Sequence, residues 1–274
     1  MKTILAPTDF SSVSVHAVNY AMDMAVDLNA ELMLVNVVEV PLLASEMPIA
    51  ESVFENMLSM AKSDLDELAA GLREKSSGKI NIRTEVTIGT VATAIDDFAQ
   101  SVRPFVIVMG MHPEKSLDRI LSGSVTLRLI SHHVAPVLIV PENVPYRRIA
   151  KAGLACDLVN VADTIPHQLL NDWLSAYNPS LDIIHLGRNE QDLDATAAGE
   201  SISLQNHFKK FNPAFHYLAG KGLSKSLNEF SSEHKLDLLI VVPKKHGILE
   251  IFDKKHSKEI IEHQQAPILA AHAL

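Results

Sequence analysis

The sequence predicts an α/β protein made of two tandem doubly wound domains, each with a five-stranded, mostly parallel sheet flanked by helices. Short apolar runs alternate with longer stretches whose apolar residues recur at helical spacing. This alternation is typical of a parallel sheet covered by helices on both faces. The same order of elements then recurs at about half the chain length. The proline-containing segment Pro141–Pro145 is a plausible linker, so we place the domains at residues 1–143 and 144–274.

Five strands are predicted in the first half, each a short run rich in apolar or β-branched residues. They are Thr3–Ala6, Leu32–Val38, Ile80–Ile88, Phe105–Met109 and Val137–Val140. Apolar and polar residues alternate along the third strand, which predicts an edge strand with one face in water. Gly110 is expected to end the fourth strand.

Four helices are predicted between these strands. Ser11 or Ser12 can cap the first, and the second follows a loop over residues 39–50 that contains two prolines. The second helix carries an apolar stripe made of Phe54, Met57, Leu58, Ala61, Leu65, Leu68 and Leu72. The third helix covers Val91–Val102, and the fourth opens at Gly123.

The second half repeats this order with a degenerate site. Its predicted strands include Ile149–Cys156, Leu181–Leu186, Leu236–Pro243 and Ala266–Leu269, and Asp157 follows the first of them as Asp9 follows Thr3–Ala6. Pro243 stands where the first half has Gly110, and Lys254 and Lys255 fall near the position of Gly123 and Ser124. Without glycine at either corner the backbone cannot approach an anionic group closely, so we interpret this half as a partner surface or a different binding site.

Composition restricts the class of protein. The chain has 274 residues, of which 47% are hydrophobic and 21% charged, as in an ordinary globular protein. Its formal net charge of −9 argues against binding to nucleic acid or an anionic membrane surface. The single cysteine cannot form an internal disulfide, and no apolar run is long enough to span a membrane. We therefore expect a cytoplasmic protein.

The stretch from Phe105 to Pro141 contains the most informative motif. A buried strand ends near Gly110, and a helix is predicted to open with Gly123, Ser124, Val125 and Thr126. The first N–H groups of a helix lack intrahelical acceptors and carry the positive end of its dipole, and two hydroxyls stand beside them. This arrangement predicts an anion site.

The segment resembles the nucleotide-binding signature of the universal stress protein family. That signature is Gly, two residues, Gly, nine residues, Gly, and then Ser or Thr. Gly110, Gly123 and Ser124 reproduce the spacing, while Pro113 replaces the second glycine. Because proline has no N–H, one phosphate donor is removed and the Gly123 corner is left as the main phosphate contact. The family includes tandem members, so the resemblance covers the whole chain, strongly in the first half and faintly in the second.

The resemblance implies a pocket for ATP or a related adenine nucleotide, with or without Mg²⁺, in the first domain. In this family the first and fourth strands are neighbours, so their ends face one crevice. The implied pocket residues are Pro7, Thr8, Asp9, Val37, Met109, Gly110, Pro113, Gly123, Ser124, Val125 and Thr126. Asp9 would contact the ribose or adenine, and Val37 would pack on the base. The two halves are expected to dock as a pseudo-dimer, with a homodimer as a further level of assembly.

Two alternatives to a nucleotide-regulated module in a stress response stay open. The chain could be an interaction scaffold that binds no nucleotide, or a weak ATP hydrolase or nucleotidyl-transfer enzyme. No nucleophile with its base and no paired carboxylates form a catalytic motif, so an enzyme is the less favoured alternative. Several histidines match no familiar metal-ligand spacing, and no metal site is predicted from them: His112, His132, His133, His246, His256, His263 and His272.

Overall fold

The computed structural model describes most of the chain. The described residues are 1–39, 51–111, 125–132, 135–187, 195–219, 223–242 and 266–272. Their contacts divide them into two compact units. Unit 1 contains the described residues of Met1–Met111 and Gly123–Val137, and unit 2 contains those of Leu138–Leu274.

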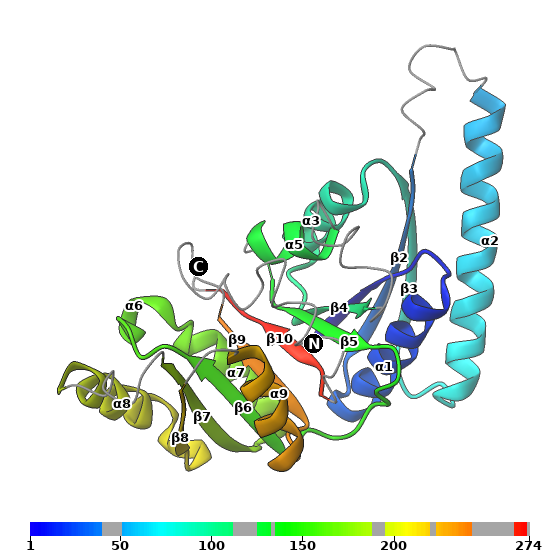
Figure 1. Ribbon diagram of the computed structural model, residues 1–274. Helices are drawn as coiled ribbons and strands as arrows, with labels where there is room; N and C mark the ends of the chain where they lie inside the picture. Colours follow the sequence, from blue (N-terminus) through cyan, green and yellow to red (C-terminus); the bar gives the residue numbers. More distant parts are fainter. Residues whose placement is uncertain are drawn as a thin grey trace. The chain divides into compact units, whose positions relative to one another are not determined.

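Unit 1 has a parallel sheet whose order is β3-β2-β1-β4 (Figure 1). Its strands are β1 (Thr3–Pro7), β2 (Glu31–Val38), β3 (Ile82–Ile88) and β4 (Val106–Met111). The registers Ile4↔Val106 and Leu5↔Ile107 make β1 and β4 direct neighbours. The adjacency expected from the family resemblance is therefore confirmed. β3 lies at the edge of this sheet, as its alternating pattern predicted.

The helices of unit 1 cover both faces of the sheet (Figure 1). They are α1 (Ser12–Leu28), α2 (Glu51–Lys75), α3 (Val91–Val102) and α5 (Val125–His132). α1 and α2 pack against the strands they connect, and α3 packs on the opposite face with α5 as its neighbour, as right-handed crossovers require. Ser11 caps α1, with its Oγ accepting from the Ser14 N–H at 3.3 Å, so the predicted cap is confirmed.

One predicted boundary is wrong. Gly110 was expected to end the fourth strand, but β4 continues through Gly110 to Met111. Both residues extend the sheet at the edge where β1 also ends. Glycine ends a strand only where the backbone needs an unusual conformation. Gly110 instead allows a close contact between β4 and α1. Residues 40–50 of the predicted loop over residues 39–50 lie outside the described residues.

The strands of unit 2 are parallel and follow the order β10-β9-β6-β7-β8. They are β6 (Lys151–Cys156), β7 (Ser180–Gly187), β8 (Ala214–Ala219), β9 (Leu238–Val241) and β10 (Ile268–Ala270). Both units thus follow the connection pattern in which the first strand lies between the second and the fourth. Strand β5 (Val137–Pro141) belongs by its contacts to unit 2 from Leu138 onward. The predicted domain boundary between residues 143 and 144 stays a prediction.

The helices of unit 2 lie between its strands, as those of unit 1 do. They are α6 (Val161–Thr164), α7 (His167–Tyr177), α8 (Ala195–Phe208), the 3-10 helix η3 (Lys209–Phe211) and α9 (Leu223–Glu233). α7 buries Leu170, Trp173 and Leu174, and Trp173 is among the largest fully buried side chains. None of the described helices combines the length and the apolar character needed to cross a membrane.

A half-buried imidazole joins three helices of unit 2. His167, the first residue of α7, has Nε2 at 2.9 Å from the Val161 carbonyl oxygen of α6, and its ring stacks on that of His207 of α8 at 3.9 Å. With Nε2–H as the donor, its buried Nδ1 has no hydrogen-bond partner among the described residues. Burial, and secondarily repulsion from His207, lower the pKa of His167 below its usual value, despite the bond to Val161.

We predict that acid destabilises unit 2 through His167. Its pKa is lowered in the folded state, so the neutral form favours folding, and this stability is full above the ordinary value of 6.5. It is lost as the pH falls from there through the folded-state pKa. Urea unfolding measured from about pH 8 to about pH 5 should show a falling midpoint, and His167→Gln should flatten this dependence. His207→Gln should give an intermediate slope, because burial remains after the repulsion is removed. An unchanged slope in His167→Gln would contradict the assignment.

Candidate functional site

The candidate site lies at the carboxyl edge of the unit 1 sheet. β1 ends at Pro7 and its neighbour β4 carries Met109 and Gly110 near its end, so these residues reach the same edge. In open parallel sheets, ligands bind beyond the strand ends where the winding changes direction. Here that point lies between β1 and β4, because the chain winds from β1 to β2 on one side and returns to β4 on the other.

The loop after β1 is fixed by β2. Thr8 is buried, its N–H donates to the Val35 carbonyl at 2.9 Å, and its own carbonyl accepts from Asn36 Nδ2 at 2.8 Å. Thr8 Oγ1 also lies 3.0 Å from Ser14 Oγ in the first turn of α1. Buried polar groups that are fully paired hold one conformation. The end of β1 is therefore positioned before any ligand arrives.

Asp9 presents an exposed carboxylate at this corner. Its Oδ1 accepts from the Ser11 N–H at 3.0 Å and from Ser11 Oγ at 2.6 Å. Partial burial opposes ionisation, but the hydrogen bonds from Ser11 and Ser14 outweigh it and lower the pKa of Asp9. At neutral pH the group is a carboxylate that can accept further hydrogen bonds from hydroxyl or amino donors and that repels phosphate.

Phe10 gives the corner its shape. Its φ of 63° lies in the left-handed region, which bulky residues rarely adopt, and its N–H donates to Thr8 Oγ1 at 3.0 Å. Such a conformation persists where the surrounding bonds determine it. Here the Thr8 hydroxyl supplies that bond, so the chain turns sharply between β1 and α1 and leaves Asp9 at the surface.

Gly110 makes room for α1 to approach β4. A Cβ built at this position would lie 2.8 Å from Val13 Cγ1 and 2.9 Å from the Val13 carbonyl carbon, with the carbonyl oxygen closer still. Two of these three atoms belong to backbone and cannot rotate away. The missing side chain at Gly110 therefore allows the first turn of α1 to pack directly on β4.

The remaining predicted site residues divide into two groups. Val37 and Met109 are half-buried at the ends of β2 and β4, and Val125 and Thr126 form the first described turn of α5, where Thr126 is buried. Pro113, Gly123 and Ser124 lie outside the described residues. The structure thus brings Pro7, Thr8, Asp9, Met109 and Gly110 to one edge of the sheet. Asn36, which holds this corner, was missed; a polar residue inside an apolar strand was its signal in the sequence.

A surface pocket of about 370 Å³ opens farther along this edge. It lies between the end of β3 and α3, and its lining includes Thr90, Thr93, Asp97, Phe98 and Ser101. None of the predicted site residues contributes to it. We do not assign it to the nucleotide, because β2 separates β3 from the β1–β4 corner.

Unit 2 repeats the corner after its first strand. Asp157 follows β6, and its Oδ1 accepts from the Val159 N–H at 3.2 Å, as Asp9 accepts from Ser11. Leu158, the next residue, has a φ of 52°, so both halves place a bulky left-handed residue after the aspartate. The residues predicted to differ most from unit 1, Pro243, Lys254 and Lys255, lie outside the described residues.

Comparison with known proteins identifies relatives of the whole fold and of the first half. A model of the universal stress protein family matches residues 1–141. Universal stress protein MJ0531 of Methanocaldococcus jannaschii is 34% identical over 142 residues, which is 52% of this chain and 82% of that protein.

Two solved structures match nearly the full chain. The crystal structure of a universal stress protein from Archaeoglobus fulgidus matches with a TM-score of 0.74 and 17% identity over 99% of this chain and 96% of that one. A structure described as a putative universal stress protein from Pseudomonas aeruginosa matches with a TM-score of 0.56 and 13% identity over 99% and 93% of the two chains. At these identities the likeness shows a common fold.

We predict that Gly110→Ala destabilises unit 1 by about 1–3 kcal/mol, because the added methyl group meets backbone atoms of Val13. Gly71→Ala is the matched control. Gly71 lies within α2 with nothing near its missing Cβ, so alanine should stabilise the helix by up to about 1 kcal/mol. Denaturant unfolding of the two variants and the parent protein makes the comparison. Equal stability of Gly110→Ala and the parent protein would refute the proposed packing role.

Proposed function

Because this chain belongs to the universal stress protein family, we propose that its first half binds ATP or a related adenine nucleotide and acts as a regulatory binding module in a stress response. The nucleotide binds with or without Mg²⁺ on its phosphates. Binding changes the affinity of the protein for its partner, and turnover of the nucleotide is not required for this role.

The observation that carries the proposal is the rigid carboxylate at the end of β1. Asp9 is ionised, exposed and held by Ser11 at the edge that β1 shares with β4. An ionised carboxylate is a strong acceptor for the two ribose hydroxyls or the adenine amino group. Its charge disfavours phosphate at the same position, so the nucleoside lies at β1 and the phosphates point away from it.

The phosphates are proposed to reach the segment between β4 and α5. This is where the glycine signature stands in the sequence, with Gly123, Ser124 and Thr126 as candidate donors. Of these, Thr126 is described, in the first turn of α5. Thr8 and Pro7 would line the pocket from β1, and Val37 and Met109 would pack against the base from β2 and β4.

The second half is proposed to bind no nucleotide and to provide a partner surface. It keeps the aspartate corner at Asp157 but has proline where Gly110 would be. We further propose that the two halves dock as a pseudo-dimer and that the protein acts in the cytoplasm.

Calorimetric titration of ATP, with and without Mg²⁺, tests the proposal. The parent protein should bind one ATP. Asp9→Ala should weaken binding about tenfold, the expected result of losing hydrogen bonds to a charged acceptor. The double change Ser124→Ala/Thr126→Ala should abolish binding.

Asp157→Ala is the matched control for Asp9→Ala, because it removes the equivalent aspartate from unit 2. Its affinity for ATP should equal that of the parent protein. If Asp157→Ala weakened ATP binding and Asp9→Ala did not, the nucleotide would bind to unit 2, and the assignment to unit 1 would be overturned.

A scaffold that binds no nucleotide is the second candidate, and one observation favours it. The close contact with Val13 is sufficient to explain why position 110 is glycine, so the glycine does not require a ligand nearby. This alternative would be established if the folded parent protein bound no ATP.

A further inference from the structure

A buried aspartate interrupts the apolar core of unit 2. Asp182 stands in β7 between Leu181 and Ile183, and its side chain is only 8% exposed. An isolated buried carboxylate is costly unless cations or hydrogen-bond donors compensate for lost hydration. The groups around Asp182 therefore indicate what this position is built to hold.

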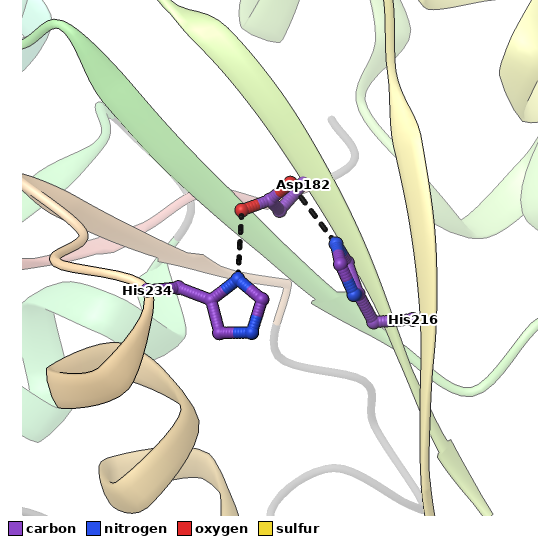
Figure 2. Close-up of side chains that lie close together, drawn as sticks. All are labelled: Asp182, His216 and His234. Atoms are coloured by element: carbon purple, nitrogen blue, oxygen red, sulfur yellow. Dashed lines mark hydrogen bonds and ion pairs between the residues drawn. The ribbon is translucent and has the colours of Figure 1, made fainter.

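Two imidazoles converge on Asp182 from different elements (Figure 2). His216 of β8 has Nε2 3.0 Å from Oδ1, and His234, just after α9, has Nδ1 3.8 Å from Oδ2. One donor atom from each of the three residues lies within 4.8 Å of the others. The sequence pattern does not predict this cluster, because Asp182 and His216 are 34 positions apart in the chain.

The sheet register explains how the cluster forms. Asp182 pairs with Ala214 in the neighbouring strand, so His216, two residues farther along β8, points to the same face. His234 approaches that face from the end of α9. Phe230 orients both imidazoles, since its ring stacks on His234 at 3.8 Å and meets His216 edge-on at 4.8 Å.

The geometry points to a binding site for a divalent first-row transition metal ion such as Zn²⁺, held by Asp182, His216 and His234. Two imidazole nitrogens and one carboxylate are a common three-ligand set for such ions. Metal–ligand bonds of about 2.0–2.1 Å in a tetrahedron place donor atoms about 3.4 Å apart. His216 lies 3.0 Å from Oδ1 and His234 lies 3.8 Å from Oδ2, while one donor atom from each of the three residues lies within 4.8 Å of the others. Small side-chain movements would therefore bring the three donor atoms to the separation that an ion requires.

The long separation between His234 and Asp182 supports this reading. At 3.8 Å the two atoms are too far apart for a hydrogen bond, although the ring is held in place by Phe230. An ion bound to both atoms would connect them. The side chains of His216 and His234 are 26% and 32% exposed, so an ion can enter from solvent.

Lys151 is the competitor for this position. Its Nζ lies 3.1 Å from Asp182 Oδ2 and so already supplies a positive charge. An incoming ion must displace this ammonium group, which can move into solvent because the Lys151 side chain is 32% exposed. Removing Lys151 should therefore strengthen metal binding, whereas a purely structural ion pair predicts only a loss of stability.

The experiment titrates Zn²⁺ into the full chain after treatment with a chelator. Each ligand substitution should weaken the affinity for Zn²⁺ at this site at least about tenfold. The three substitutions are Asp182→Asn, His216→Gln and His234→Gln. Lys151→Met should strengthen binding at the same site. His207→Gln is the matched control, because it removes an exposed imidazole of the same unit outside the cluster and should leave Zn²⁺ binding unchanged.

Co²⁺ gives a second readout that does not depend on the ligand variants folding. When Co²⁺ binds the parent protein, visible absorption bands of low-symmetry nitrogen and oxygen coordination should appear. At limiting Co²⁺ these bands should be more intense in Lys151→Met. The inference is overturned if the parent protein binds neither ion, if His207→Gln weakens binding as much as His216→Gln, or if Lys151→Met weakens it. These results are independent of the ATP titration.

Discussion

The contact between the first turn of α1 and β4 is the constraint on which the candidate site depends. Because Gly110 has no side chain, the backbone of Val13 reaches β4 directly. This approach places the loop between β1 and α1 beside the end of β4, and Thr8 and Asn36 then lock that loop with buried hydrogen bonds. Asp9 is exposed and fixed as a consequence. The same glycine that the family resemblance associates with a ligand is thus first a packing residue.

The two halves preserve this corner to different degrees. Each has an aspartate after its first strand whose carboxylate accepts a hydrogen bond from the N–H two residues on, and the bulky residue between them is in the left-handed conformation. The repeated backbone geometry shows that the turn belongs to the fold itself. The ligand specificity of a half must then come from other segments, and at the sequence position of Gly110 the two halves diverge, because the second half has Pro243 there.

Polar residues inside apolar strands mark the chemically important positions in both units. Asn36 in β2 positions the corner that follows β1 in unit 1. Asp182 in β7 gathers His216, His234 and Lys151 near the opposite, amino-terminal end of its strand in unit 2. Burying such groups costs free energy unless partners satisfy them, so each requires a specific environment. The two units therefore offer different chemistry at different edges of similar sheets.

The sequence by itself determined the fold class, nearly every strand and helix of the first half, the edge position of β3, and the adjacency of β1 and β4 through the family resemblance. These features follow from local periodicity and from short motifs, which neighbouring residues specify. Only the tertiary structure decided that Gly110 lies within β4 against Val13, that Phe10 and Leu158 are left-handed, and that Asp182 meets two histidines. Each of these depends on strand register and on helices packing across the sheet. Such contacts join residues far apart in the chain, and no pattern of near neighbours encodes them.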